Sequence, residues 1–203
     1  MDNVIQGAMR HKLSDVEIRR ITNNEVKIML YDELEEYENI IDAIGRTNKL
    51  IILFPTNSDN YRGHYIAILY YPNERLISHF DSYGLSPKVE LSYSTNGYVK
   101  EKLLNNLYSK AILNGYRVDY NTTRLQKMTD NISDCGSWCS VRCRFDYLSN
   151  QEFAKMFIGQ RMPPDFYITC LTFLLLNDED TYENKIKKLL KVRHSERAKL
   201  LWK

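Results

Sequence analysis

A small set of side chains in this sequence could together carry out nucleophilic chemistry on a carbonyl group. Cys135 lies in Asp134-Cys135-Gly136, where a polar loop ends and an apolar helix is expected to begin. Free backbone N–H groups at a helix N-terminus favour the thiolate form of a cysteine. Cys135 is therefore the candidate nucleophile. A Cys-Gly pair on its own would instead indicate a cysteine that merely packs in the core.

His64 is the candidate base, and Asp81 is the carboxylate that is expected to orient it. Residues 64–71 and 75–82 are rich in strand-forming residues and flank a Pro-Asn turn, which predicts a β-hairpin. A four-residue loop over 71–74 would set position 70 opposite position 75, and His64 directly opposite Asp81. The carboxylate could then fix one imidazole tautomer. A loop one residue longer or shorter would put the two on opposite faces.

Two further residues complete this set or compete with it. Gln126 lies nine residues before Cys135 and could donate its amide to an oxyanion, with Asn121 and Asn131 as the alternative donors. His79 shares a strand face with the candidate acid and is the rival base.

Cys139 and Cys143 follow Cys135 at intervals of four, so three thiols would share one helical face. Helical Cys-x3-Cys-x3-Cys is not a usual zinc spacing, and no nearby histidine completes it. We therefore predict small buried apolar residues at these positions, and neither a metal nor a cofactor. With no secretory signal, clustered cysteines indicate a reducing compartment rather than disulfides.

The elements that must position these residues alternate between helix and strand. Ser14 and Glu17 match a capping box and predict a helix start. The sequence predicts strands over 26–30, 50–54, 64–71, 75–82 and 116–120, a short helix or loop over 34–44, and helices over 99–108, 135–148 and 166–176. This order predicts the α+β class, with a central mixed or antiparallel sheet packed against the helix that carries the nucleophilic cysteine.

Length and composition set limits on the whole chain. The 203 residues suit one domain over 1–180 and a basic, helical C-terminal tail over 181–203. A net charge of +2 is too small to indicate a polyanion partner for the chain as a whole. No apolar stretch approaches the roughly 18 residues of a membrane span, so no membrane partner is expected. The tail could touch nucleic acid, or it could be a solvated helix face.

The motifs, taken in order, resemble a known group of cysteine peptidases. They are Gly63-His64, Phe80-Asp81-Ser82-Tyr83-Gly84, Leu125-Gln126 and Ile132-Ser133-Asp134-Cys135-Gly136-Ser137-Trp138, and the aspartate lies seventeen positions after the histidine. This set resembles the adenain-like and ubiquitin-like-protein-protease clan, and within it the proteases of virophages and Polinton-type transposons. The resemblance spans roughly residues 14–176.

The resemblance implies a thiol endopeptidase with His64, Asp81, Gln126 and Cys135 as its catalytic residues. It implies cleavage of capsid or core precursor proteins during virion maturation, after small residues such as glycine, in the virion and in the cytoplasmic viral factory of the host cell. Adenovirus proteases use DNA and a peptide as activators, which makes the basic tail a candidate activator site.

Other functions are compatible with the same residues. The main alternative is an isopeptidase of the deubiquitinase or deSUMOylase type, although Tyr65 stands where such enzymes often carry a tryptophan. A protein acetyltransferase with a similar triad and a non-enzymatic metal or scaffold module are the remaining alternatives.

Overall fold

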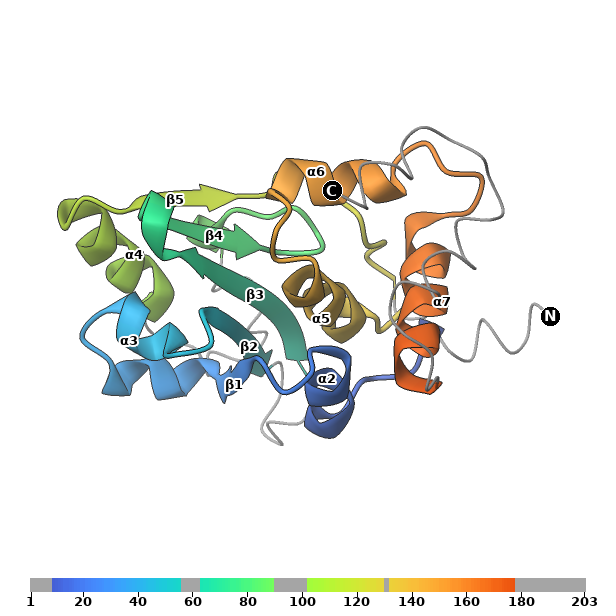
Figure 1. Cartoon of the computed structure of the whole chain (residues 1–203), viewed down its shortest axis with the longest axis horizontal. Helices are drawn as coiled ribbons and strands as arrows, with labels where there is room; N and C mark the ends of the chain where they lie inside the picture. Colours follow the sequence, from blue (N-terminus) through green and yellow to red (C-terminus); the bar gives the residue numbers. More distant parts are fainter. Residues whose placement is uncertain (1–8, 56–62, 90–101, 130–131, 178–203) are drawn as a thin grey trace.

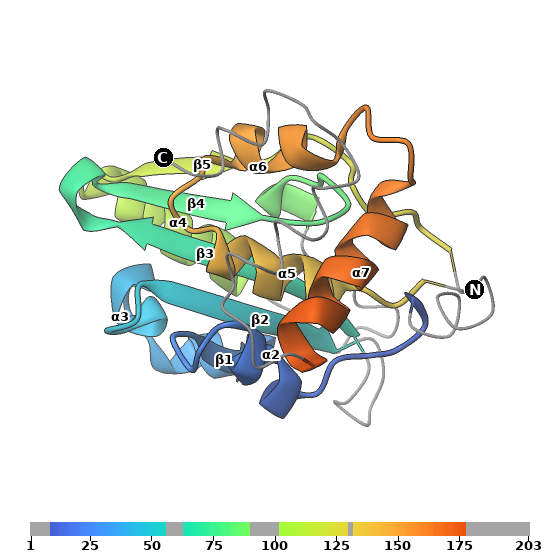
Figure 2. The same cartoon turned by 45° about the vertical axis from the view of Figure 1, so that its right-hand side comes forward.

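A five-stranded mixed sheet forms the centre of the molecule (Figures 1 and 2). The computed structural model describes residues 9–55, 63–89, 102–129 and 132–177. The strands lie side by side in chain order, with the outer pairs parallel and the inner pairs antiparallel. They are β1 (Lys27–Leu30), β2 (Lys49–Pro55), β3 (Gly63–Tyr71), β4 (Leu76–Phe80) and β5 (Arg117–Tyr120). The predicted α+β class with a central mixed sheet is confirmed.

Helices cover both faces of this sheet, as Figure 1 shows. On one face lie η1 (Tyr31–Glu36), α3 (Ile40–Ile44) and α4 (Leu103–Leu113); on the other lie α2 (Asp15–Ile21), α5 (Cys135–Arg144), α6 (Asn150–Phe157) and α7 (Pro164–Asn177). β2 is apolar from position 50 to position 55 because both of its faces are buried: Leu50 and Ile52 belong to one core, and Ile51 to the other. No helix in the described part of the chain is long and apolar enough to cross a membrane.

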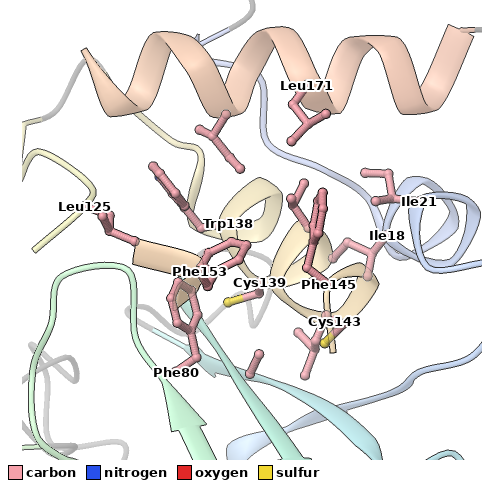
Figure 3. Close-up of a cluster of buried hydrophobic side chains, with 14 of the residues drawn as sticks. Ile18, Ile21, Phe80, Leu125, Trp138, Cys139, Cys143, Phe145, Phe153 and Leu171 are labelled. Carbon is pink, nitrogen blue, oxygen red and sulfur yellow. The ribbon is translucent and has the colours of Figure 1, made fainter. Parts of the chain in front are cut away.

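Helix α5 is buried between the sheet and the surrounding helices. Figure 3 shows Trp138, Cys139 and Cys143 of this helix within a cluster that includes Phe80 of β4 and Phe153 of α6. Both thiols are 0% exposed, so the prediction that they pack as small core residues is confirmed. The helix that begins with Cys135 is thereby fixed against the sheet.

The register of the β3–β4 hairpin differs from the sequence prediction by two residues. Tyr71 pairs with Leu76, so the loop covers 72–75. The predicted pairing of positions 70 and 75 is therefore wrong, and so is the predicted placement of His64 directly opposite Asp81. The physical reason is Arg75, which closes a 3-10 turn over Pro72–Glu74 in the left-handed conformation, with a φ of 48°. A shift of two residues keeps every side chain on its expected face.

The end of α5 also differs from the prediction of a helix over 135–148. The buried guanidinium of Arg142 binds the backbone carbonyls of Phe145 and Leu148, which therefore do not continue the helix. Ser149 then caps a separate helix, α6, which the sequence analysis missed. The predicted tail over 181–203 lies outside the described residues.

Gly63 provides the first test of the structure. A Cβ atom at this position would lie 1.9 Å from the carbonyl oxygen of Phe54. Because that neighbour is backbone, we expect Gly63→Ala to lower the free energy of unfolding by about 3 kcal/mol. The matched control is Gly136→Ala, whose Cβ would meet Tyr65 at an ordinary contact distance of 3.5 Å. Urea melts that show equal losses for the two variants would contradict the close strand approach at Gly63.

Candidate active site

The thiol of Cys135 lies at the N-terminus of α5, where the helix meets the start of β3. Cys135 is the first residue of the helix and is partly exposed. The imidazole of His64 and the backbone of Tyr65 and Gly136 lie close enough to its thiol to lower its pKa. The predicted placement of Cys135 among free N–H groups at a helix start is therefore what the structure shows.

His64 connects this thiol to Asp81. Nε2 of His64 lies 3.0 Å from Oδ1 of Asp81, at the buried end of the sheet. Since Nε2 faces the carboxylate, Nδ1 is the ring nitrogen left to face Cys135. The same Oδ1 accepts the backbone N–H of Tyr83 at 2.8 Å. The structure thus brings together the three residues predicted from the sequence as base, orienting carboxylate and nucleophile.

Tyr83 is a residue of this site that the sequence analysis did not assign. Its ring stacks on the imidazole of His64, with 4.7 Å between centroids and 16° between planes. A stacked aromatic face favours a charged imidazole and restricts its rotation. Tyr83 belongs to the quoted Phe-Asp-Ser-Tyr-Gly motif, but the motif alone does not reveal the stacking.

The pKa values of His64 and Cys135 shift in opposite directions. Burial disfavours the imidazolium, yet the hydrogen bond to Asp81 and the interaction with Asp81 and Cys135 raise the pKa of His64 to about 9. Burial also disfavours the thiolate, yet His64 and the neighbouring backbone lower the pKa of Cys135. Both shifts favour a thiolate–imidazolium pair at neutral pH.

The rival base His79 lies elsewhere. Its Nδ1 is 3.0 Å from the hydroxyl of Tyr108 on α4, across the sheet from α5. Burial is the main cause that lowers the pKa of His79 to about 4, so the ring is neutral near pH 7. His79 is therefore placed as a core histidine.

Gln126 is held beside the segment that carries Asp81. Its backbone N–H donates to the carbonyl of Ser82 at 3.0 Å, and its Oε1 accepts the Ser82 hydroxyl at 2.6 Å. The side chain is 1% exposed, and Nε2 has no hydrogen-bond partner among the described residues. A buried amide with a free donor suits a group that binds a developing charge.

The other cysteines lack the features of a nucleophile. Burial raises the pKa of all three thiols. The pKa of Cys139 lies well above its ordinary value, that of Cys143 is about 12, and that of Cys170 is also raised. Within the described ranges, no three His, Cys, Asp or Glu side chains form a group that could hold a metal ion. Of the four cysteines, Cys135 alone has a lowered pKa.

Asp134 and Asp165 form a second feature that sequence reasoning missed. Asp134 is 1% exposed, and neither of its carboxyl oxygens has a hydrogen-bond partner in the described part of the chain. Burial, the nearby charge of Asp165 and that of Cys135 raise the pKa of Asp134 to about 9. Asp134 is therefore protonated near neutral pH, directly before Cys135.

The burial of Asp134 predicts how the stability of the folded protein depends on pH. The unfolded chain loses the Asp134 proton near pH ~4, whereas the folded protein keeps it to about pH 9. The folded state is therefore progressively penalised as pH rises through this window. We expect Asp134→Asn to raise Tm by about 2–4 °C or more at pH ~8, and by much less at pH ~4. Thermal melts at both values check this, and a gain that does not depend on pH would contradict it.

Comparison with known proteins finds a relative by sequence and similar solved structures. No protein-family model matches the sequence. Uncharacterized protein V9 of Sputnik virophage is 31% identical over 166 residues, which cover 79% of this chain and 93% of V9. The crystal structure of the ASFV pS273R protease has a TM-score of 0.43 and 16% identity, covering 79% of this chain and 67% of that one. Its selenomethionine form has a TM-score of 0.41 and 18% identity over the same shares.

Proposed function

We propose that this chain, which belongs to the family of uncharacterized protein V9 of Sputnik virophage, is a cysteine peptidase. Cys135 is its nucleophile, His64 its base and acid, and Asp81 the residue that orients His64. The observation that carries this proposal is the buried imidazole of His64, with a carboxylate on one side and a thiol on the other. That arrangement is the one that nucleophilic catalysis by cysteine needs.

The proposed reaction follows from the charges of the site. The Cys135 thiolate attacks the peptide carbonyl, and the carbonyl oxygen becomes an oxyanion. His64 gives its proton to the leaving amine, and a thioester with Cys135 remains. The neutral imidazole then takes a proton from water, which attacks the thioester and releases the acid product. Asp81 stabilises the charged imidazole without itself being protonated.

Gln126 is proposed to stabilise the oxyanion through its free Nε2 donor. Loss of one such donor costs about 10²–10³ in kcat, so Gln126→Ala is expected to lower kcat by that factor. The rate of Cys135 alkylation should stay close to wild type, because the donor acts on the oxyanion rather than on the thiolate. The matched control is Gln160→Ala, whose amide donates to a carbonyl within the α6 region. A fall in kcat below about tenfold would place the donor elsewhere.

The proposed substrates are capsid or core precursor proteins cleaved during virion maturation, after small residues such as glycine, in the virion and the host cytoplasm. A virophage member of the family supports this viral setting. The test is to incubate the protein with the structural proteins encoded beside it and to identify new termini by mass spectrometry. New termini after small residues support the proposal. Cleavage confined to ubiquitin-like adducts would instead support an isopeptidase.

A further inference from the structure

The side chain of Asn121 lies where strand β5 leaves the sheet. β4 and β5 pair as far as His79 and Tyr120, and the N–H of Asn121 then donates to the carbonyl of His79 at 3.3 Å. Beyond this point the Asn121 amide replaces the strand backbone. Its Oδ1 accepts the N–H of Asp81 at 2.8 Å, and its Nδ2 donates to the carbonyl of Asp81 at 2.7 Å.

This pairing satisfies both backbone polar groups of Asp81 in a buried place. Asp81 is 1% exposed and Asn121 is 4% exposed, so few other partners can reach these groups. Leaving a buried N–H or C=O without a partner is costly, and the amide matches both groups at once. A fixed Asp81 peptide also fixes the direction of its carboxylate, whose Oδ1 meets His64.

Asn121 also connects the Asp81 segment to the segment that carries Gln126. Its Nδ2 donates to the carbonyl of Thr123 at 3.2 Å. Two residues later in the chain, the N–H groups of Leu125 and Gln126 both donate to the carbonyl of Ser82. Because its amide is bonded to Asp81 and Thr123, Asn121 is not placed as an oxyanion donor; Asn131 lies outside the described residues.

We propose that Asn121 is a positioning residue of the active site, because its amide holds the peptide of Asp81 and so presents the carboxylate to His64. The inference rests on the proposed function of Cys135, His64 and Asp81. Its consequence is that loss of the amide lets the carboxylate move away from the imidazole. His64 then holds its proton less tightly, and Cys135 loses the charge that favours its thiolate.

The test uses two substitutions of Asn121 and a matched control. Asn121→Asp keeps the size of the side chain but replaces the Nδ2 donor with an oxygen that faces two carbonyls, and Asn121→Ala removes the amide. The control is Asn150→Ala, since the buried Asn150 donates to the carbonyl of His79 on the same strand at 3.0 Å without a bond to Asp81. The readouts are the pH midpoint of Cys135 alkylation, located by mass spectrometry, and kcat on a peptide.

Both Asn121 variants are expected to move the alkylation midpoint of Cys135 to higher pH and to lower kcat on the order of 10²-fold, as a misplaced catalytic group does. The Asn150 control should lose stability but keep the wild-type midpoint. All rates are measured below each Tm, and Asn121→Asp carries the test if the alanine variant does not fold. An unchanged midpoint and kcat in a folded Asn121 variant would overturn the positioning role. Labelling of another cysteine in the wild type would instead overturn the proposed function itself.

Discussion

Replacing Cys135 with serine is expected to leave the protein folded and to lower kcat by about 10⁴-fold or more. A serine hydroxyl ionises far less readily than a thiol, so the neighbouring imidazolium cannot hold it as an anion. The partly exposed side chain is not part of the packed core, which makes loss of stability a small effect. Peptide turnover and a thermal melt of the variant give the two measurements.

Two cysteines of the same helix supply the control. A limiting dose of iodoacetamide near pH ~6, below the free-thiol pKa, should label Cys135 first and abolish activity in step with labelling. Cys139→Ala and Cys143→Ala should retain the labelling and the turnover, at the cost of some core stability. Labelling mainly on Cys139 or Cys143 with activity intact would make α5 a core element that happens to contain three thiols.

Removal of His64 is expected to have the second largest effect. In the wild type, the lowered pKa of Cys135 and the His64 pKa of about 9 maintain the ion pair through the neutral range. In His64→Ala the thiol returns to or above its ordinary pKa of about 8.5, so alkylation near pH ~6 should slow by about 10²-fold. In the wild type, cleavage should fall as pH rises through about 9, because His64 then loses the proton that it gives to the leaving amine.

His79→Ala is the matched control for this prediction, since His79 is also a buried strand histidine. Its Nδ1 faces Tyr108 rather than Cys135, so the alkylation rate at low pH should not change. A slowed rate in His79→Ala with a normal rate in His64→Ala would show that His79, and not His64, is the base.

Much of the fold could be predicted because its signals are local. The capping box of Ser14 and Glu17 forms as expected, and the apolar run of β2 lies between two other strands. The hairpin register could not be predicted, because it depends on a left-handed conformation at Arg75, and nothing about an arginine indicates one. The early end of α5 depends on contacts of the Arg142 guanidinium with carbonyls that follow the helix.

The candidate site could also be predicted only in part. His64, Asp81 and Cys135 could be selected because each lies in a short motif whose chemistry is recognisable. The two-residue error in register did not separate the first two, since parity along the strands was kept. Asn121 gave no local signal for its contact with Asp81, because the two residues are 40 positions apart and meet only when β5 joins the sheet.

The parallel pairing of β5 with β4 has a consequence for the kinetics of folding. The chain must cross over through α4 before β5 can lie beside β4, so Asn121 reaches Asp81 only after a long loop has closed. Pairings of this kind form slowly compared with helices and hairpins. The β3–β4 hairpin can therefore form while Asp81 still lacks its backbone partner. During refolding, rapid alkylation of Cys135 at low pH would therefore appear late. The reactivity of this thiol would report when β5 joins the sheet.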